Sequence, residues 1–186
     1  MHQVGGTIKQ ALDRIVANDY VLPAIQREFV WRPEQICRLF DSLMQGYPFG
    51  DFLFWKIEPI NSKNYRYYGF VLDYHQRDNP HCPDLGPITD KAITAVLDGQ
   101  QRLTAFNIGL RGSMALKLPY YQERFDYAFP EKVLALNLLA ETESDEEGNV
   151  YTFAFVKEEQ IGKLEDVLWF KVGDILTMSE GPEMLN

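Results

Sequence analysis

The chain has 186 residues, 46% of them hydrophobic and 24% charged, which are values of a globular protein and exclude extensive disorder. One domain of this length buries a core large enough to fold without disulfides, and the two cysteines do not form a secreted disulfide framework. The net charge of −9 argues against a strongly basic nucleic-acid-binding module.

The first half of the chain predicts two amphipathic helices around an extended segment. Apolar residues recur at helical spacing over residues 7–18 and form one stripe, which predicts the first helix. Residues 20–27 are expected to be extended, because Pro23 disfavours helical angles in the residue before it. A second helix is predicted over 33–46, since this segment starts with proline and ends with glycine. The continuous apolar run within 51–57 predicts a strand buried on both faces.

The second half predicts mainly strands around one further helix. Aromatic residues within 65–74 indicate one or two strands, and the segment 75–91 is rich in loop-forming residues. A strand over 94–97 stops at an Asp-Gly pair, and a helix with regularly spaced apolar residues follows. The segments 133–139 and 150–156 predict a C-terminal β-hairpin.

These elements predict an α+β fold in which a small mixed sheet is flanked by helices. Residues 1–186 are expected to form a single domain, and because the chain ends without a clear stop signal we expect it to be the N-terminal part of a longer protein. The sequence has no long apolar run and no leader pattern, so we expect a cytoplasmic protein with no membrane segment.

The excess negative charge is confined to the last third of the chain. Residues 1–130 carry 14 Lys and Arg against 14 Asp and Glu, whereas residues 131–186 carry 4 against 13. Much of this excess lies in the acidic segment 141–147. Because like charges repel and stay hydrated, we favour a solvated loop over a metal site there.

The segment Asp98-Gly99-Gln100-Gln101-Arg102 lies where the predicted strand enters a helix. The first N–H groups of a helix attract anions, glycine allows close approach of the backbone, and arginine binds phosphate through two N–H groups. Asp98 could hold Mg²⁺ or orient an attacking water. The segment therefore predicts a phosphate-binding pocket, although the same pattern fits a helix capped by Asp98 with Arg102 at the surface.

A second pair of amide and guanidinium groups, Gln26-Arg27, follows the extended segment. If this segment lies near the turn at Asp98, arginines and glutamines from both segments converge. Such a set fits polyanion recognition, because guanidinium matches phosphate geometry and amides can position water.

Other catalytic chemistries have no clear signal in the sequence. There is neither a P-loop nor a dinucleotide-binding glycine motif. The spacing of His75, His81 and Cys82 matches no common zinc site, so exposed loop positions are expected. Cys37 has no base spaced to activate it as a nucleophile.

Three ordered blocks together resemble the N-terminal domain family of GmrSD-type, modification-dependent restriction systems. The blocks are Leu22–Trp31, Leu39–Gly50 and Leu97–Thr104, and they agree with the family in order, spacing and residue identity. With the region 133–175, the resemblance covers nearly the whole chain.

That family is similar to the ParB and sulfiredoxin superfamily, whose signature Gly-x-x-Arg-x-x-Ala occurs here from Gly99 to Ala105. The resemblance implies a ParB/sulfiredoxin-like fold, and in ParB-like proteins this segment binds nucleotide phosphates. Sulfiredoxin has a cysteine where this chain has Gln100, so sulfinic-acid repair is not implied.

The resemblance implies binding of a nucleoside triphosphate with Mg²⁺ at this segment, followed by hydrolysis. Arg27 and Arg102 would bind phosphates, and the backbone of Gly99 and Gln100 would surround them.

Catalytic roles are implied for four side chains, of which Asp98 would also bind the metal. Together with Gln26, Gln101 and Arg102, it would position the attacking water or the metal.

Family members regulate attack on foreign DNA that carries modified bases or backbones. The expected partners are therefore the nucleotide, modified DNA reached through the full-length protein, and a C-terminal or separate HNH nuclease domain. Two alternatives remain open, namely a nucleotide- or DNA-sensing module without catalysis and a ParB-like domain that itself cuts DNA.

Overall fold

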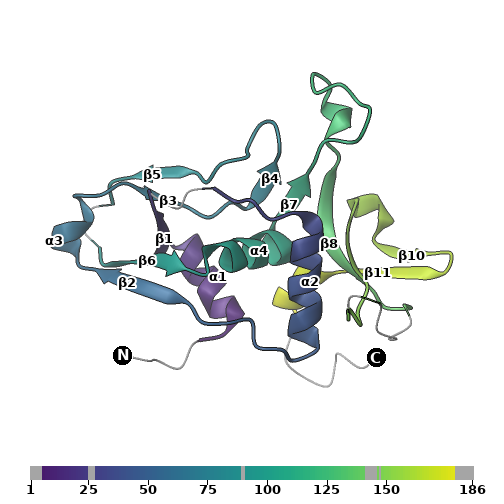
Figure 1. Cartoon of the computed structure of the whole chain (residues 1–186), viewed down its shortest axis with the longest axis horizontal. Helices are drawn as coiled ribbons and strands as arrows, with labels where there is room; N and C mark the ends of the chain where they lie inside the picture. Colours follow the sequence, from purple (N-terminus) through teal and green to yellow (C-terminus); the bar gives the residue numbers. More distant parts are fainter. Residues whose placement is uncertain (1–5, 25–27, 89–90, 141–145, 147, 179–186) are drawn as a thin grey trace.

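The computed structural model describes residues 6–24, 28–88, 91–140, 146 and 148–178 and has a mixed α+β fold (Figure 1). Within these ranges, two mixed sheets lie on either side of the helices α1, α2 and α4 (Figure 1). The predicted α+β class is confirmed, but the single small sheet that we expected is two sheets of five and six strands. The helices are α1 (Ile8–Val16), α2 (Pro33–Met44), α3 (Pro59–Ser62), α4 (Gln100–Arg111) and the 3₁₀ turns η1 (Asp126–Ala128), η2 (Glu158–Gln160) and η3 (Val172–Leu176).

The helices predicted in the first half are confirmed by α1 and α2. Thr7 caps α1, because its hydroxyl accepts from the N–H of Gln10 while the Gln10 amide oxygen accepts from the N–H of Thr7. Leu12 and Ile15 of α1 are buried. Pro33 opens α2, as its fixed backbone angle favours.

The first sheet has the strand order β2-β6-β1-β3-β5. β6 lies parallel to β1 and antiparallel to β2, so the strand that leads into α4 is covered by a neighbour on both sides. Its strands are β1 (Tyr20–Pro23), β2 (Leu53–Ile57), β3 (Tyr67–Tyr68), β5 (Asp84–Gly86) and β6 (Ile93–Asp98).

The second sheet has the order β10-β11-β8-β7-β4, and β9 also pairs with β8. The β8–β9 pair is antiparallel and places Leu134 opposite Phe155 and Leu136 opposite Phe153, so these side chains share one face. Its strands are β4 (Asp73–His75), β7 (Ser113–Ala115), β8 (Glu131–Asn137), β9 (Phe153–Val156), β10 (Gly162–Leu164) and β11 (Val167–Lys171).

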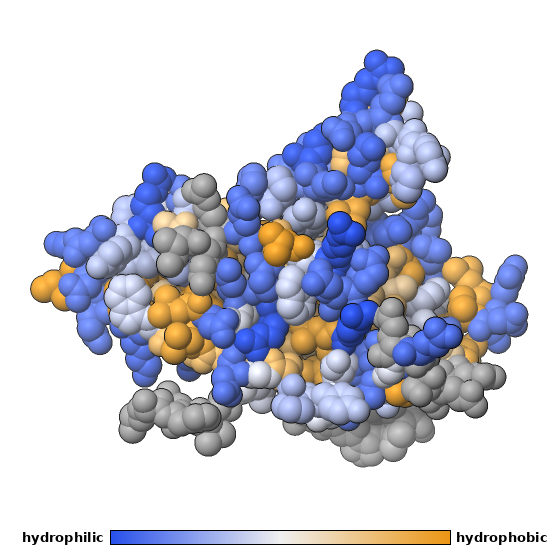
Figure 2. All heavy atoms as spheres, viewed as in Figure 1, coloured by the Kyte–Doolittle hydropathy of each residue, from blue (hydrophilic) through white to orange (hydrophobic). Residues whose placement is uncertain are grey.

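The prediction that the apolar run of β2 is buried on both faces is wrong. Leu53, Phe54 and Trp55 are 57%, 38% and 42% exposed, because β2 forms an edge of the first sheet. Apolar side chains are accordingly visible on this face of the molecule, over the position of β2 (Figure 2). Tyr20 stacks on Phe54 with ring centroids 4.9 Å apart, which covers part of the strand.

The core is centred on α4, where every residue from Leu103 to Leu110 is buried. The ring of Phe40 on α2 meets Phe106 of α4 edge to face, with centroids 5.7 Å apart. Gly109 lies in the same contact, and a Cβ there would be 2.7 Å from Phe40. The absence of a side chain at Gly109 therefore sets how closely α2 approaches α4.

We predict that Gly109→Ala lowers the free energy of unfolding by about 1–3 kcal/mol through overpacking, although alanine is the better helix former. Urea denaturation measures the change. The substitution Phe40→Leu removes the ring that the new methyl group would strike, so Gly109→Ala in that background should cost less than in the wild type. An unchanged cost in the two backgrounds would show that Phe40 does not set the helix spacing.

Candidate functional site at the N-terminus of helix α4

Strand β6 passes into α4 through a single residue, Gly99. Gly99 is the N-cap of α4 and has a φ of 85°, in the left-handed region that residues with a side chain rarely adopt. A Cβ at this position would also overlap the ring of Phe52. Both the turn and the packing therefore require glycine, and the first N–H groups of α4 stay without intrahelical acceptors.

Asp98 does not cap the helix. Gly99 occupies the cap position and α4 has no side-chain cap, so the alternative in which Asp98 caps α4 is wrong. The Asp98 side chain is 74% exposed, and its carboxylate lies 3.8 Å from Nη2 of Arg102. An exposed carboxylate beside the helix N-terminus is free of packing constraints and can accept a hydrogen bond or bind a cation.

The side chain of Gln101 connects α4 to the segment after β1. Its Nε2 donates to the carbonyl of Glu28 over 2.7 Å, and its Oε1 accepts from the N–H of Val30 over 3.1 Å. Gln26 and Arg27, which we expected at the pocket, lie outside the described residues. The structure therefore places the segment that follows them against the first turn of α4.

Arg102 connects α4 to the turn before β2. Its Nη1 donates to the carbonyl of Phe49 and its Nη2 to that of Asp51, the latter over 2.8 Å. The guanidinium carbon lies 4.9 Å from the centroid of the Phe52 ring, which adds a cation–π contact. Gly50, with a φ of 84°, brings the turn this close, since a Cβ there would be 2.5 Å from Nη1 of Arg102. Arg102 is thus 19% exposed rather than a free surface residue.

Within this segment, the side chain of Gln100 has a polar atom without a hydrogen-bond partner in the described part of the chain. Its Oε1 is buried and accepts no hydrogen bond from any residue that the structure describes. A buried oxygen without a donor costs about 1–3 kcal/mol, so a donor from a ligand or water would stabilise the site.

The segment can accommodate Mg²⁺ only together with an anion. The described ranges contain no group of three or more His, Cys, Asp or Glu side chains able to hold a metal ion. Magnesium commonly binds one or two carboxylates together with phosphate and water, so Asp98 is a sufficient protein ligand if phosphates supply the rest.

The expectation of exposed loop positions is confirmed for His81 but wrong for Cys82, which is buried, and for His75, which lies on β4 and is partly buried. Burial raises the pKa of the Cys37 thiol to about 12 and that of Cys82 to about 11, so both are neutral at physiological pH. His75 Nδ1 accepts from the backbone N–H groups of Arg77 and Asp78, which orients the ring.

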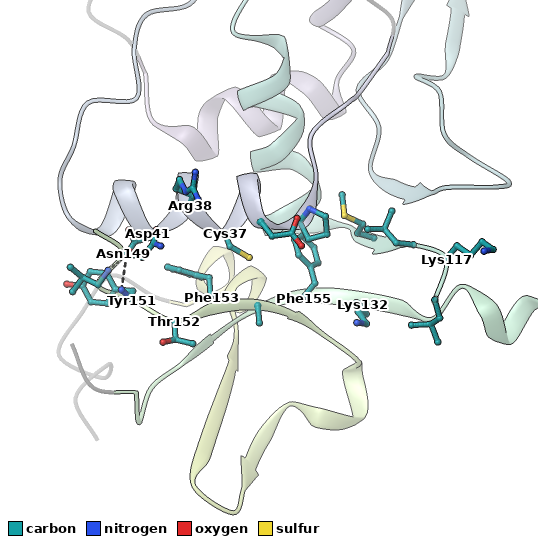
Figure 3. A pocket seen from close by; sticks show the side chains of 17 residues that line it. Cys37, Arg38, Asp41, Lys117, Lys132, Asn149, Tyr151, Thr152, Phe153 and Phe155 are labelled. Carbon is teal, nitrogen blue, oxygen red and sulfur yellow. Dashed lines mark hydrogen bonds between the residues drawn. The ribbon is translucent and has the colours of Figure 1, made fainter. Parts of the chain in front are cut away.

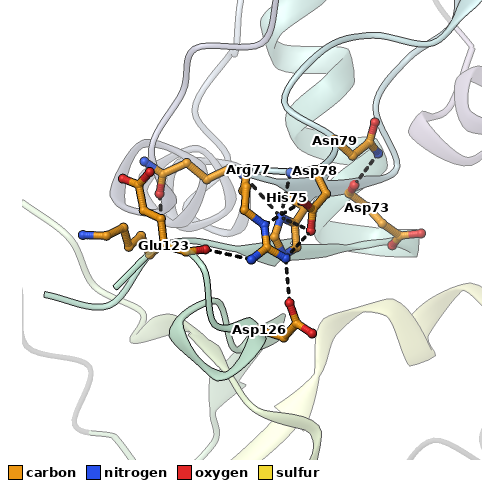
Figure 4. A network of polar contacts seen from close by, with 9 residues as sticks. Asp73, His75, Arg77, Asp78, Asn79, Glu123 and Asp126 are labelled. Carbon is orange, nitrogen blue, oxygen red and sulfur yellow. Dashed lines mark hydrogen bonds and ion pairs between the residues drawn. The ribbon is translucent and has the colours of Figure 1, made fainter. Parts of the chain in front are cut away.

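His75 belongs to a polar network that sequence reasoning missed (Figure 4). Arg77 donates to both carboxylate oxygens of Asp78 and to Asp126, at 2.7 to 2.8 Å, and to the carbonyl of Glu123. Its hydrogen bond to Asp78 is the main reason why the pKa of that carboxyl lies below its usual range. Arg77 thereby attaches the projecting segment 119–127 to the loop after β4. Glu123 and Asp126 are 46 and 49 residues away from Arg77 in the chain, so residue spacing could not predict these contacts.

A cavity of about 660 Å³ between α2 and the second sheet was also missed (Figure 3). Asp41 of α2 is 3% exposed and accepts from the backbone N–H groups of Val150 and Tyr151 at one end of this cavity. The sequence signal was a polar side chain on the apolar stripe of the second predicted helix. None of the residues that line the cavity belongs to the segment 98–102.

A family model described as the N-terminal domain of the GmrSD restriction endonuclease matches residues 8–175. The match spans most of the sequence, so the chain belongs to this family, and the resemblance of the three blocks is confirmed. No curated protein matches the chain. None of the helices in the described ranges is long and apolar enough to cross a membrane.

We predict that Asp78→Asn lowers the Tm more at about pH 7 than at about pH 3. The lowered pKa of Asp78 means that its carboxylate stabilises the fold above the ordinary aspartate value of 3.8, and that this contribution is lost as the pH falls through the lowered value. Thermal unfolding of wild type and variant across this range measures the effect. The control is Asp166→Asn on the exposed turn between β10 and β11, and an equal difference in Tm at both pH values would contradict the role of Asp78.

Proposed function

We propose that this domain binds a nucleoside triphosphate with Mg²⁺ at the first turn of α4 and hydrolyses it. The proposal takes the chain as a ParB/sulfiredoxin-like domain that regulates a restriction system. The observation that carries it is the left-handed Gly99 at the N-cap, where the first N–H groups of the twelve-residue helix α4 have no intrahelical acceptor and lie beside an arginine. The buried Oε1 of Gln100 supports it, because a ligand hydroxyl or bound water would supply the missing donor.

Some groups at this site would bind the phosphates, and others would orient the reacting water. Backbone N–H groups after Gly99 would accept the phosphates, and Arg102 has N–H groups beyond the two that bind carbonyls. Arg27, which directly precedes Glu28 in the sequence, would add a second guanidinium. Mg²⁺ would supply charge neutralisation at the phosphates, and Asp98 is the residue that would hold it.

Hydrolysis further requires that a water be oriented toward the terminal phosphate. Asp98 is exposed and adjacent to the helix N-terminus, so its carboxylate can accept a hydrogen bond from that water. Gln26 and Gln101 are the amides proposed to assist. The amide of Gln101 already binds the backbone of Glu28 and Val30, so its part would be to position the segment that carries Gln26 and Arg27.

Membership of the GmrSD N-terminal domain family supports a role in a restriction system. We propose that nucleotide turnover in this domain regulates attack on modified foreign DNA by an HNH nuclease domain, either C-terminal to this one or on a separate chain. The net charge of −9 makes DNA contact by this chain alone weak, since phosphate contacts supply much of the affinity for DNA.

A sensing module without catalysis is the second candidate, and one observation favours it. Both Gln101 and Arg102 are engaged in holding neighbouring backbone, which reduces what they can contribute to a transition state. A DNA nuclease has less support, because the described residues offer no cluster of carboxylates or histidines for a metal-dependent nuclease centre.

We predict that Asp98→Asn reduces phosphate release from Mg²⁺-nucleotide by at least about tenfold, the loss typical of a disturbed metal site. The measurement is phosphate release from a panel of nucleoside triphosphates, with binding followed by calorimetry. Asp13→Asn, at an exposed position of α1, is the matched control and should behave as wild type.

The two readouts separate the candidate functions. Wild-type phosphate release that persists in Asp98→Asn would contradict the catalytic proposal. Binding by the wild type without any phosphate release would support the sensing module, and Gly99→Ala should then weaken binding because alanine neither adopts this φ readily nor fits beside Phe52.

A further inference from the structure

The cavity between α2 and the second sheet has two chemically different sides (Figure 3). A stripe of α2 that includes Cys37 and Asp41 forms one wall, since these positions are four residues apart on one helical face. Phe153 and Phe155 of β9 point toward α2 from the opposite wall (Figure 3). Asp41 lies at one end, and Lys117 and Lys132 lie toward the other (Figure 3).

Three cationic side chains, Arg38, Lys117 and Lys132, line the cavity against two carboxylates, Glu34 and Asp41. The negative charge of Asp41 is already engaged, because Oδ1 accepts two backbone N–H groups and Oδ2 accepts from Nε2 of Gln45 over 2.7 Å. Lys117 and Lys132 are half-buried, and neither ammonium group has an ion pair within the described part of the chain. Two lysines without an ion pair among the described residues line the same cavity and give this end a positive potential, which favours an anion.

The middle of the cavity is apolar and aromatic. Phe153 and Phe155 line it together with Met114, the residue opposite Lys132 on the neighbouring strand. Cys37 adds a neutral thiol, since burial raises its pKa to about 12. Such walls favour a flat, apolar group over a hydrated one.

We propose that this cavity binds one nucleotide unit, with the base against the apolar middle of the cavity and the phosphate at Lys117 and Lys132. A planar ring joined to an anion matches the two sides of the cavity, and its volume of about 660 Å³ suits a ligand of this size. The site is separate from the first turn of α4, so it does not depend on the function proposed there. The unit can come from a free nucleotide or from one nucleotide turned out of a DNA strand, as enzymes that read single bases require.

The test is calorimetric binding of deoxynucleoside monophosphates to the full chain. Replacing both lysines in Lys117→Ala/Lys132→Ala should weaken binding by about tenfold or more, since two charge-assisted contacts are lost. The matched control Lys56→Ala/Lys163→Ala removes two exposed lysines away from the cavity and should bind as wild type. Circular dichroism confirms that each variant folds, and Cys37→Phe, which fills the apolar wall without changing charge, should weaken binding as well.

Further binding measurements identify the source of the nucleotide unit and test whether it binds at another site. Deoxyribose 5-phosphate, which lacks the base, should bind at least about tenfold more weakly than the nucleotides. Single-stranded oligonucleotides that bind through the same two lysines would assign the unit to DNA, and binding by monophosphates alone would assign it to free nucleotide. The proposal is overturned if no nucleotide or oligonucleotide binds, if the lysine variant binds as wild type, or if the base-free phosphate binds equally well.

Discussion

Arg102 donates to the carbonyls of Phe49 and Asp51, and this interaction determines where the first turn of α4 meets the rest of the chain. Gln101, its neighbour, holds the backbone of Glu28 and Val30 in the same way. The three sequence blocks that identify the family therefore converge on one helix end. Residues of these blocks build the junction, in which the N–H groups after Gly99 have no intrahelical acceptor. Structure and proposed phosphate binding thus depend on the same side chains.

Charge is distributed unevenly along the chain, and the junction lies in its neutral part. The neutral first 130 residues contain the junction, whereas the acidic excess lies beyond them. Lys117 and Lys132 lie on either side of this boundary and line a cavity in which one of the two carboxylates, Asp41, accepts hydrogen bonds from backbone N–H groups. The net negative charge is therefore compatible with the two anion sites that we propose, one at backbone N–H groups and the other at ammonium groups.

Local signals in the sequence were sufficient for the helices and for the junction at Gly99, because capping, periodicity and glycine turns depend on near neighbours. They could not show that the apolar strand β2 lies at a sheet edge, since exposure depends on which strand lies beside it. For the same reason spacing predicted Arg102 as a phosphate ligand or surface residue, but not its two carbonyl partners some 50 residues away. The cavity could not be predicted because the residues of α2 that line it face strands that come more than 70 residues later in the sequence.

The central claim is that the N–H groups at the start of α4 receive the phosphates of a nucleotide. Titration of ¹⁵N-labelled protein with Mg²⁺-nucleotide, followed by amide chemical shifts, tests it most directly. The account predicts the largest shifts at residues 99–102, with the Arg102 side-chain signals moving at the same nucleotide concentration. Shifts confined to other parts of the chain, with the amides of 99–102 unchanged at saturation, would contradict it.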